Sequence, residues 1–215
     1  MTSSSFPISG STVLVTDASV VINLNATTRA REILMAVPGK FAVTENALAE
    51  LARGASNGHD DAAQLHALID TGLIQLVCLG AGASPVYESL VEGSALCTLD
   101  DGEAATIAHA QEIGGVAMID ERKARRLCAQ SFPTLQVAST VDLLLHDAVA
   151  QALGLNDCID TVFKALMMAR MRVPPDQTAK VIALIGEERA AACKCLRRTA
   201  RITPDATAPV RCEPS

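Results

Sequence analysis

Short aliphatic runs alternate with helical patterns along most of this chain, and this alternation limits its fold more than any other feature. The aliphatic runs lie at 12–16, 41–43, 73–79, 116–119 and 135–137. Strands that alternate with helices form a parallel sheet, because each helix carries the chain back across the sheet. Parallel strands are covered on both faces, so they read as continuous aliphatic runs. We therefore expect a three-layer α/β/α fold around a central parallel sheet of four to five strands.

The composition indicates one folded domain with an aliphatic core. Of the 215 residues, 49% are hydrophobic, 20% are charged and only 2% are aromatic. This length holds one sizeable core and leaves little room for a second full domain. We expect a disordered lead-in at 1–10 and a domain at 11–190. Its C-terminal helical extension follows from helical patterns at 140–153, 157–171 and 176–192, and a disordered tail is expected at 191–215.

Charge and cysteine content weigh against several functional classes. The formal net charge is −6. A protein that binds nucleic acid tightly and without sequence preference usually carries a basic surplus, so the net charge weighs against this class. Seven cysteines occur without a CxxC pair and without a histidine at zinc-ligand spacing, so we expect free thiols rather than a zinc site. The first residues lack the features of a signal peptide, and no apolar run reaches the length of about 18 residues that a membrane helix needs. We therefore expect a cytoplasmic location and no membrane span.

Two aspartates come directly after predicted strands. Asp17 follows the run at 12–16, and Asp120 follows the run at 116–119. The carboxyl ends of parallel strands form the ligand-binding edge of an open sheet, so two strands are predicted to bring a carboxylate to the same edge. Glu50 lies in the helix after the strand at 41–43 and can lean over this edge. Glu103 lies in the first turn of a later helix.

Four converging carboxylates favour a hard divalent cation. The carboxylates repel one another, and one or more would take up a proton if no cation were bound. Mg²⁺ and Mn²⁺ prefer oxygen ligands and remove this penalty. Beside a phosphodiester such ions polarise the phosphoryl group and activate a water, and a pair of them can stabilise both the entering and the leaving oxygen. No serine-hydrolase, HExxH, P-loop or dinucleotide-binding motif stands out in the sequence.

Each acid also has a purely structural interpretation. Asp17 and Asp120 can cap the helices that follow them. Glu103 can form a capping box with Asp100, and this role is compatible with metal binding. Glu50 taken alone would be an ordinary solvated helix residue.

Four polar residues are candidates for supporting or alternative roles: Ser19, Asn23, Asp100 and Glu121. Ser19 and Asn23 can orient Asp17 from the second shell, or they can be ordinary polar residues of the first helix. Glu121 can serve in place of Asp120, although we prefer Asp120 because it adjoins the strand.

A basic run follows the last of these acids. Arg122, Lys123, Arg125 and Arg126 form the only dense basic run in the body of the chain. They are either a strip that contacts RNA phosphates beside the metal site or a solvated helix face.

The order of these motifs resembles that of the PIN-domain family. The segments VTDASVVINL, FAVTENALAEL, LDDGEAATIAHA and VAMIDERKARRLC resemble the four acidic elements of that family. Glu103 takes the third acidic place, in the variant where a Gly-Glu pair opens the helix. The segment STVDLLLHDAVAQALG resembles the helix after the last strand in one bacterial and archaeal subfamily. The resemblance runs from about Thr12 to Gly186.

The resemblance implies an endoribonuclease that depends on Mg²⁺ or Mn²⁺ and hydrolyses RNA phosphodiester bonds. Its catalytic and metal-binding residues would be Asp17, Glu50, Glu103 and Asp120. Such proteins are often the toxin of a VapBC-type, type II toxin–antitoxin pair, which implies an antitoxin protein as a partner. The apolar faces of the late helices are compatible with a homodimer.

Two other functional classes were weighed against a nuclease. The first is a non-catalytic PIN-like module that binds nucleic acid or protein, which the net charge and the glutamate at 103 favour. The second is an aspartate-based phosphatase or phosphoacceptor domain, in which a strand also ends at an aspartate. That class is disfavoured, because Ala18 and Ser19 follow Asp17 where a second carboxylate is needed.

Overall fold

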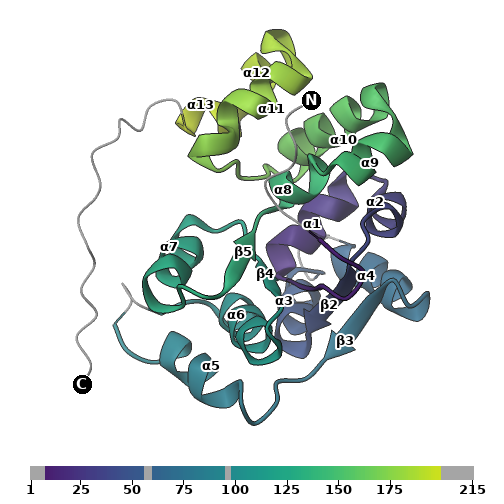
Figure 1. Cartoon of the computed structure of the whole chain (residues 1–215). Coiled ribbons are helices and arrows are strands. Elements are labelled where there is room, and N and C mark those ends of the chain that lie inside the picture. Colours follow the sequence, from purple (N-terminus) through teal and green to yellow (C-terminus); the bar gives the residue numbers. More distant parts are fainter. Residues whose placement is uncertain (1–7, 56–59, 95–97, 200–215) are drawn as a thin grey trace.

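The computed structural model describes residues 8–55, 60–94 and 98–199, which form a five-stranded sheet between two layers of helices (Figure 1). The strands are β1 (Val13–Thr16), β2 (Lys40–Thr44), β3 (Ile74–Val77), β4 (Val116–Met118) and β5 (Gln136–Ala138). Their order is β3-β2-β1-β4-β5, and all neighbours are parallel. The predicted three-layer α/β/α architecture with four to five parallel strands is therefore confirmed.

Different helices cover the two faces of the sheet. One layer contains α5 (Ser84–Val91), α6 (Asp101–Ile113) and α7 (Arg122–Ser131). The other layer contains α1 (Ala18–Ala26), α2 (Ala30–Ala36), α4 (Asp61–Asp70), α8 (Thr140–Leu144), α9 (Asp147–Leu153) and α10 (Leu155–Met168). Helix α3 (Glu45–Ala55) contacts both α4 and α6, so it joins the two layers at the end of β2.

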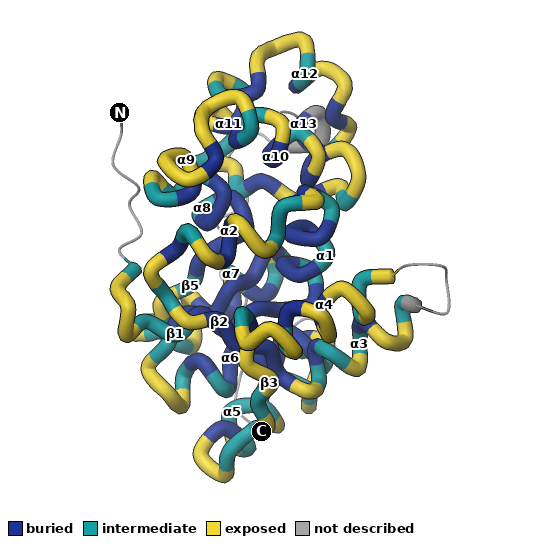
Figure 2. The backbone as a smooth tube through the Cα atoms, turned by 90° about the vertical axis from the view of Figure 1, so that its right-hand side faces the viewer, coloured by how far each residue is buried: buried dark blue, intermediate teal, exposed yellow. Residues whose placement is uncertain are grey.

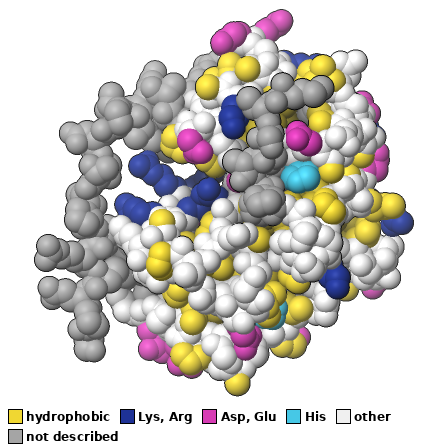
Figure 3. Space-filling model, in the orientation of Figure 1, with side chains coloured by type: hydrophobic (Ala, Val, Ile, Leu, Met, Phe, Trp, Pro, Cys, Tyr) yellow, Lys and Arg dark blue, Asp and Glu magenta, His cyan; other side chains and the backbone are white. Residues whose placement is uncertain are grey.

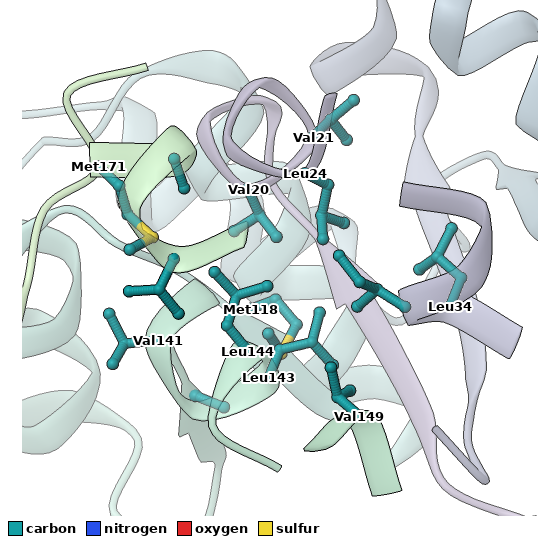
Figure 4. Close-up of a cluster of buried hydrophobic side chains, with 14 of the residues drawn as sticks. Val20, Val21, Leu24, Leu34, Met118, Val141, Leu143, Leu144, Val149 and Met171 are labelled. Atoms are coloured by element: carbon teal, nitrogen blue, oxygen red, sulfur yellow. The ribbon is translucent and has the colours of Figure 1, made fainter. Parts of the chain in front are cut away.

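Successive residues of the central strand point into two different cores. Leu14 packs on the side of α1, and its neighbour Val15 packs on the side of α6, each with no exposed surface. Burial on both faces explains why this strand reads as a continuous aliphatic run. Figure 2 shows this buried centre, and Figure 4 shows the larger core, where Leu24 of α1 lies near Met118 of β4.

The chain after α10 adds a helical extension to this core. It contains a 3₁₀ turn, η1 (Pro175–Gln177), and the helices α11 (Thr178–Ile185), α12 (Glu187–Ala192) and α13 (Lys194–Thr199). Cys193 and Leu196 are buried in the larger core. Helix α13 thus occupies 194–199, where the sequence analysis expected a disordered tail from residue 191. Residues 200–215 lie outside the described residues.

Two further expectations concern membranes and thiols. In the described part of the chain, no helix is both long and apolar enough to cross a membrane. The cysteines that the structure describes in detail are free thiols, as predicted: Cys78, Cys128, Cys158, Cys193 and Cys195.

Candidate metal centre

The adjacent strands β1 and β4 end side by side, and a buried aspartate follows each of them. Thr16 pairs with Met118, and the backbone N–H of Asp17 donates to the Met118 carbonyl at 3.2 Å. Asp17 is 3% exposed and Asp120 is 7% exposed. The structure thus places both aspartates at the carboxyl-terminal edge of the sheet, where ligands bind in open parallel sheets.

The carboxylate of Asp17 is only half satisfied by hydrogen bonds. Its Oδ2 caps α1 by accepting from the backbone N–H of Ser19 at 3.2 Å and from the Ser19 hydroxyl at 2.7 Å. Its Oδ1 is buried and has no hydrogen-bond partner in the described structure. Burial raises the pKa of Asp17 to about 6, and the charge of Asp100 adds to this rise, while the bonds from Ser19 oppose it. Asp17 is therefore both a helix cap and a carboxylate with one free oxygen.

Glu50 brings a second unpartnered oxygen to the same place. Its Oε2 is buried and also lacks a hydrogen-bond partner in the described structure. A Cβ added to Gly102, in the first turn of α6, would lie 2.4 Å from this Oε2 and 3.2 Å from Asp17 Oδ1. The two free oxygens, from α3 and from the end of β1, therefore border one small space that the missing side chain of Gly102 leaves open.

Two acids at the start of α6 complete this group, which we call the acidic cluster: Asp17, Glu50, Asp100 and Glu103. Asp100 is exposed at the rim and caps α6 by accepting from the Glu103 N–H at 2.9 Å. Glu103 is 6% exposed, and burial followed by the charges of Asp100 and Asp17 raises its pKa to about 8. Burial and the same two charges raise the pKa of Glu50 to about 7. Asp100, which the sequence offered only as an alternative, thus belongs to the cluster.

The acidic cluster fits a hard divalent cation on chemical grounds. Its donors are carboxylate oxygens, and two of them are buried without partners. Burial, followed by repulsion between the carboxylates, raises the pKa values of Glu50 and Glu103 to about 7 and 8, a penalty that a cation would relieve. Among the described residues, no three Asp, Glu, His or Cys side chains already stand in a geometry that would hold an ion. Binding of an ion here therefore requires side-chain rotation, which the exposed Asp100 and the half-buried Glu50 can provide.

Asp120 differs from these acids because both of its oxygens are engaged. Oδ1 accepts from the backbone N–H of Thr140 at 2.7 Å, and Oδ2 accepts from Asn23 Nδ2 at 2.7 Å and from the Thr140 hydroxyl. Burial raises the pKa of Asp120, and the bonds from Thr140 and Asn23 and the charge of Arg125 oppose that rise.

Two sequence-based interpretations are corrected by these contacts. Asn23 holds Asp120 rather than Asp17, because its side-chain amide donates to Asp120 Oδ2. Asp120 does not cap α7, whose N-cap position is taken by Glu121; it binds the first residue of α8 instead. Neither contact has a signal in the sequence, because the partners lie 97 and 20 residues apart.

Glu121, the alternative fourth acid, forms an ion pair with Arg172 in the segment after α10. Its side chain is 33% exposed, and its charge contributes to the raised pKa of Glu103. Glu121 therefore lies between the acidic cluster and a basic residue that the sequence analysis did not select.

The basic run at the start of α7 divides into two pairs. Arg122 and Arg126 are exposed. Lys123 donates to the carbonyl of Thr98, and Arg125 donates to the carbonyl of Ile119 at 3.2 Å. Figure 3 shows Lys and Arg side chains gathered over α7. The run is therefore neither a uniformly solvated face nor four equally available phosphate ligands.

A hollow of about 550 Å³ lies at the opposite end of the strands. It is lined by residues near the start of β1 and β4, such as Thr12 and Gly115, and by residues before β5, such as Thr134. Its lining contains no charged side chain and no histidine, so it offers no counterpart to the acidic cluster.

Comparison with known proteins gives one match. A family model described as a PIN domain matches residues 13–187. No curated protein and no solved structure matches the chain. The matched range begins at the first residue of β1 and includes the acidic cluster, Asp120, α7 and Arg172.

Proposed function

Since this chain belongs to the PIN-domain family, whose members are generally nucleases that use divalent metals, we propose that it is an endoribonuclease that requires Mg²⁺ or Mn²⁺ and hydrolyses RNA phosphodiester bonds. The observation that supports this proposal best is the pair of buried, unpartnered oxygens of Asp17 and Glu50 beside Gly102. A carboxylate oxygen that is buried without a donor is costly unless a cation or a proton compensates it.

The residues of the acidic cluster would have different roles in metal binding, which follow from their surroundings. Asp17, Glu50 and Glu103 would hold the cation, with Asp100 at the rim. The cation supplies polarisation of the phosphoryl oxygen and a water of lowered pKa. Ser19 fixes Oδ2 of Asp17, so Oδ1 is the oxygen left for a ligand. No Ser, Cys or Lys nucleophile belongs to the cluster, which is compatible with attack by water.

Asp120 would act as a positioning residue in this proposal. Its hydrogen bonds join the end of β4 to α1 through Asn23 and to α8 through Thr140. They fix the edge of the sheet next to Asp17, and the negative charge of Asp120 adds to the field that attracts a cation. The sequence-based role of Asp120 as a metal ligand and catalytic residue is therefore replaced in this proposal by a positioning role.

The finer role as the toxin of a type II toxin–antitoxin pair is part of the same proposal. It rests on the resemblance of the motifs, and it predicts a small antitoxin encoded next to this chain that inhibits RNA cleavage. A cytoplasmic location and a homodimer also belong to it. Isolation of a co-expressed small protein that blocks cleavage would support this role, whereas a chain that cleaves RNA and has no such neighbour would be a solitary nuclease.

A second candidate is a non-catalytic module that binds RNA or protein. The full engagement of both Asp120 oxygens favours it, because this leaves fewer free carboxylate oxygens for metal ions. The two candidates differ in metal-dependent cleavage: the nuclease requires it, and the binding module lacks it.

The test is cleavage of a mixed single-stranded and structured RNA with Mn²⁺ or Mg²⁺. EDTA and Asp17→Asn should each reduce the rate at least about 100-fold, because a metal ion supplies several kcal/mol of charge stabilisation. Asp70→Asn removes one exposed carboxylate at the end of α4 and is the matched control. Equal rates in all arms would refute the metal-dependent mechanism.

A further inference from the structure

Arg172, in the segment after α10, is exposed between two buried residues. Met171 and Val173 are 1% and 8% exposed, and the backbone N–H of Met171 donates to the Ala165 carbonyl at 3.1 Å. Arg172 lies between these two buried residues, and its side chain is 62% exposed. Met171 and Val20 of α1 belong to the same buried core, which Figure 4 shows.

The guanidinium of Arg172 is linked to the acidic cluster through Glu121. It forms an ion pair with Glu121, and the charge of Glu121 acts on Glu103 within the cluster. The exposed Arg122 follows Glu121 directly, and the exposed Arg126 lies one turn further along α7. Glu121 therefore has an exposed arginine from a distant part of the chain as its ion-pair partner, and two further exposed arginines follow it on α7.

The negative electrostatic potential around this site repels the phosphates of an RNA. The chain carries a net charge of −6, and the acidic cluster adds local negative charge. A cation in the cluster compensates the carboxylates, but the neighbouring phosphates of the RNA remain without a counter-charge. A guanidinium binds phosphate through two parallel hydrogen bonds, and partly exposed ion pairs such as Glu121–Arg172 are weak enough to be exchanged.

We propose that Arg172 binds an RNA phosphate next to the one that is cleaved, exchanging Glu121 for that phosphate, and that Arg122 and Arg126 continue the same strip. This inference rests on the proposed function. It assigns RNA contact to the segment between α10 and α11, and it replaces Lys123 and Arg125, whose side chains bond to backbone carbonyls, as the leading contacts.

The experiment measures RNA binding with the full chain in an Asp17→Asn background, which prevents cleavage. A fluorescent single-stranded RNA is titrated with the parent, with Arg172→Gln and with Arg31→Gln, at several salt concentrations. Arg31 is exposed on α2, which lies in the other helical layer from α7, so Arg31→Gln is the matched charge control.

We expect Arg172→Gln to weaken binding about 5- to 10-fold and to reduce the slope of log K against log salt by about 0.7, because one phosphate contact with a single strand is lost. Arg31→Gln should bind like the parent, and Arg172→Lys should recover part of the affinity. Equal affinity of Arg172→Gln and Arg31→Gln would overturn the inference.

Cleavage by the unmodified chain separates this inference from the proposed function. If that chain cleaves RNA and Arg172→Gln binds like the control, the inference alone fails. If that chain does not cleave RNA with Mn²⁺, the proposed nuclease function fails, while weaker binding by Arg172→Gln still supports a phosphate contact. Melting temperatures of the two Gln variants should agree within about 1 °C, because neither substitution touches a buried group.

Discussion

Asp17 and Asp120 occupy equivalent places in the sequence pattern but have opposite surroundings. Asp17 directly follows β1, Asp120 follows β4 after one residue, and each is buried. Asp17 leaves Oδ1 without a partner and is repelled by Asp100. Asp120 accepts hydrogen bonds at both oxygens, from Asn23 and Thr140. The same local signal therefore produces one carboxylate that lacks a counter-charge and one that the fold has already satisfied.

This difference separates two requirements of a metal site. A ligand needs an oxygen that no protein donor occupies, and a rigid site needs groups whose orientation is fixed before the ion arrives. Asp17 meets the first requirement on Oδ1 and part of the second on Oδ2, through Ser19. Asp120 meets the second requirement. The following predictions test this division of roles.

The largest expected effect is on stabilisation by metal. Mn²⁺ at about 100 times its Kd should stabilise the unmodified chain by about 2.7 kcal/mol, and Asp17→Asn should abolish this gain. Asp120→Asn should keep most of this stabilisation, because both oxygens of Asp120 already accept hydrogen bonds from Thr140 and Asn23. Differential scanning fluorimetry with and without EDTA measures the gain. An equal loss in both variants would show that the two carboxylates act alike.

The next effect concerns stability without metal. Asp120→Asn offers one acceptor oxygen to donors that now use two, so it should cost about 1–2 kcal/mol of unfolding free energy. For a chain of this size that lowers Tm by a few degrees. Asp17→Asn should not lower Tm, since Asn is an equally good helix cap and like-charge repulsion is relieved. Urea unfolding in EDTA measures the free energy of unfolding of both variants. A larger loss of unfolding free energy in Asp17→Asn than in Asp120→Asn would contradict the proposed roles of the two aspartates.

A smaller effect is expected from the space beside Gly102. In Gly102→Ala the new Cβ would fall 2.4 Å from Glu50 Oε2, so that side chain must move away. We expect Mn²⁺ affinity to fall about tenfold, which corresponds to about 1.4 kcal/mol, with no loss of metal-free stability. Gly54→Ala is the control, because an added Cβ there meets no atom within 4 Å. Similar affinities for the two variants, measured by calorimetry, would place the ion elsewhere.

A further effect is the dependence of metal-free stability on pH. The pKa values of Asp17, Glu50 and Glu103 are raised to about 6, 7 and 8, so the folded chain binds more protons than the unfolded chain between about pH 4 and 8. Stability from these groups is therefore present at low pH and is lost as pH rises through this window. The free energy of unfolding in EDTA should therefore be lower at pH 8 than at pH 5.

Urea unfolding at both pH values in EDTA measures this loss. Asp17→Asn should make the profile flatter, because it removes one titrating group and one source of repulsion for Glu50 and Glu103. Saturating Mn²⁺ should do the same in the unmodified chain, since a cation favours the charged carboxylates. A stability that rises from pH 5 to 8 without metal would contradict the proposed surroundings of the acidic cluster.

The amino-acid sequence determined the parts of this protein that depend on local pattern. Aliphatic runs and helix periodicity predicted the parallel sheet and its three layers, and the family was identified from the order of its acidic motifs. The position of Asp17 and Asp120 at strand ends followed from the same pattern. The segment at 194–199 was missed, because the burial of Cys193 and Leu196 depends on contacts with distant helices.

Only the tertiary structure decided what each acid contacts. That Asn23 holds Asp120, that Asp100 joins the acidic cluster, that Gly102 leaves space for two free oxygens and that Arg172 reaches Glu121 all depend on how distant elements pack. Periodicity encodes which side of an element is buried, because that is a property of neighbouring residues. The identity of a partner across the fold is set by three-dimensional packing, which no local spacing records.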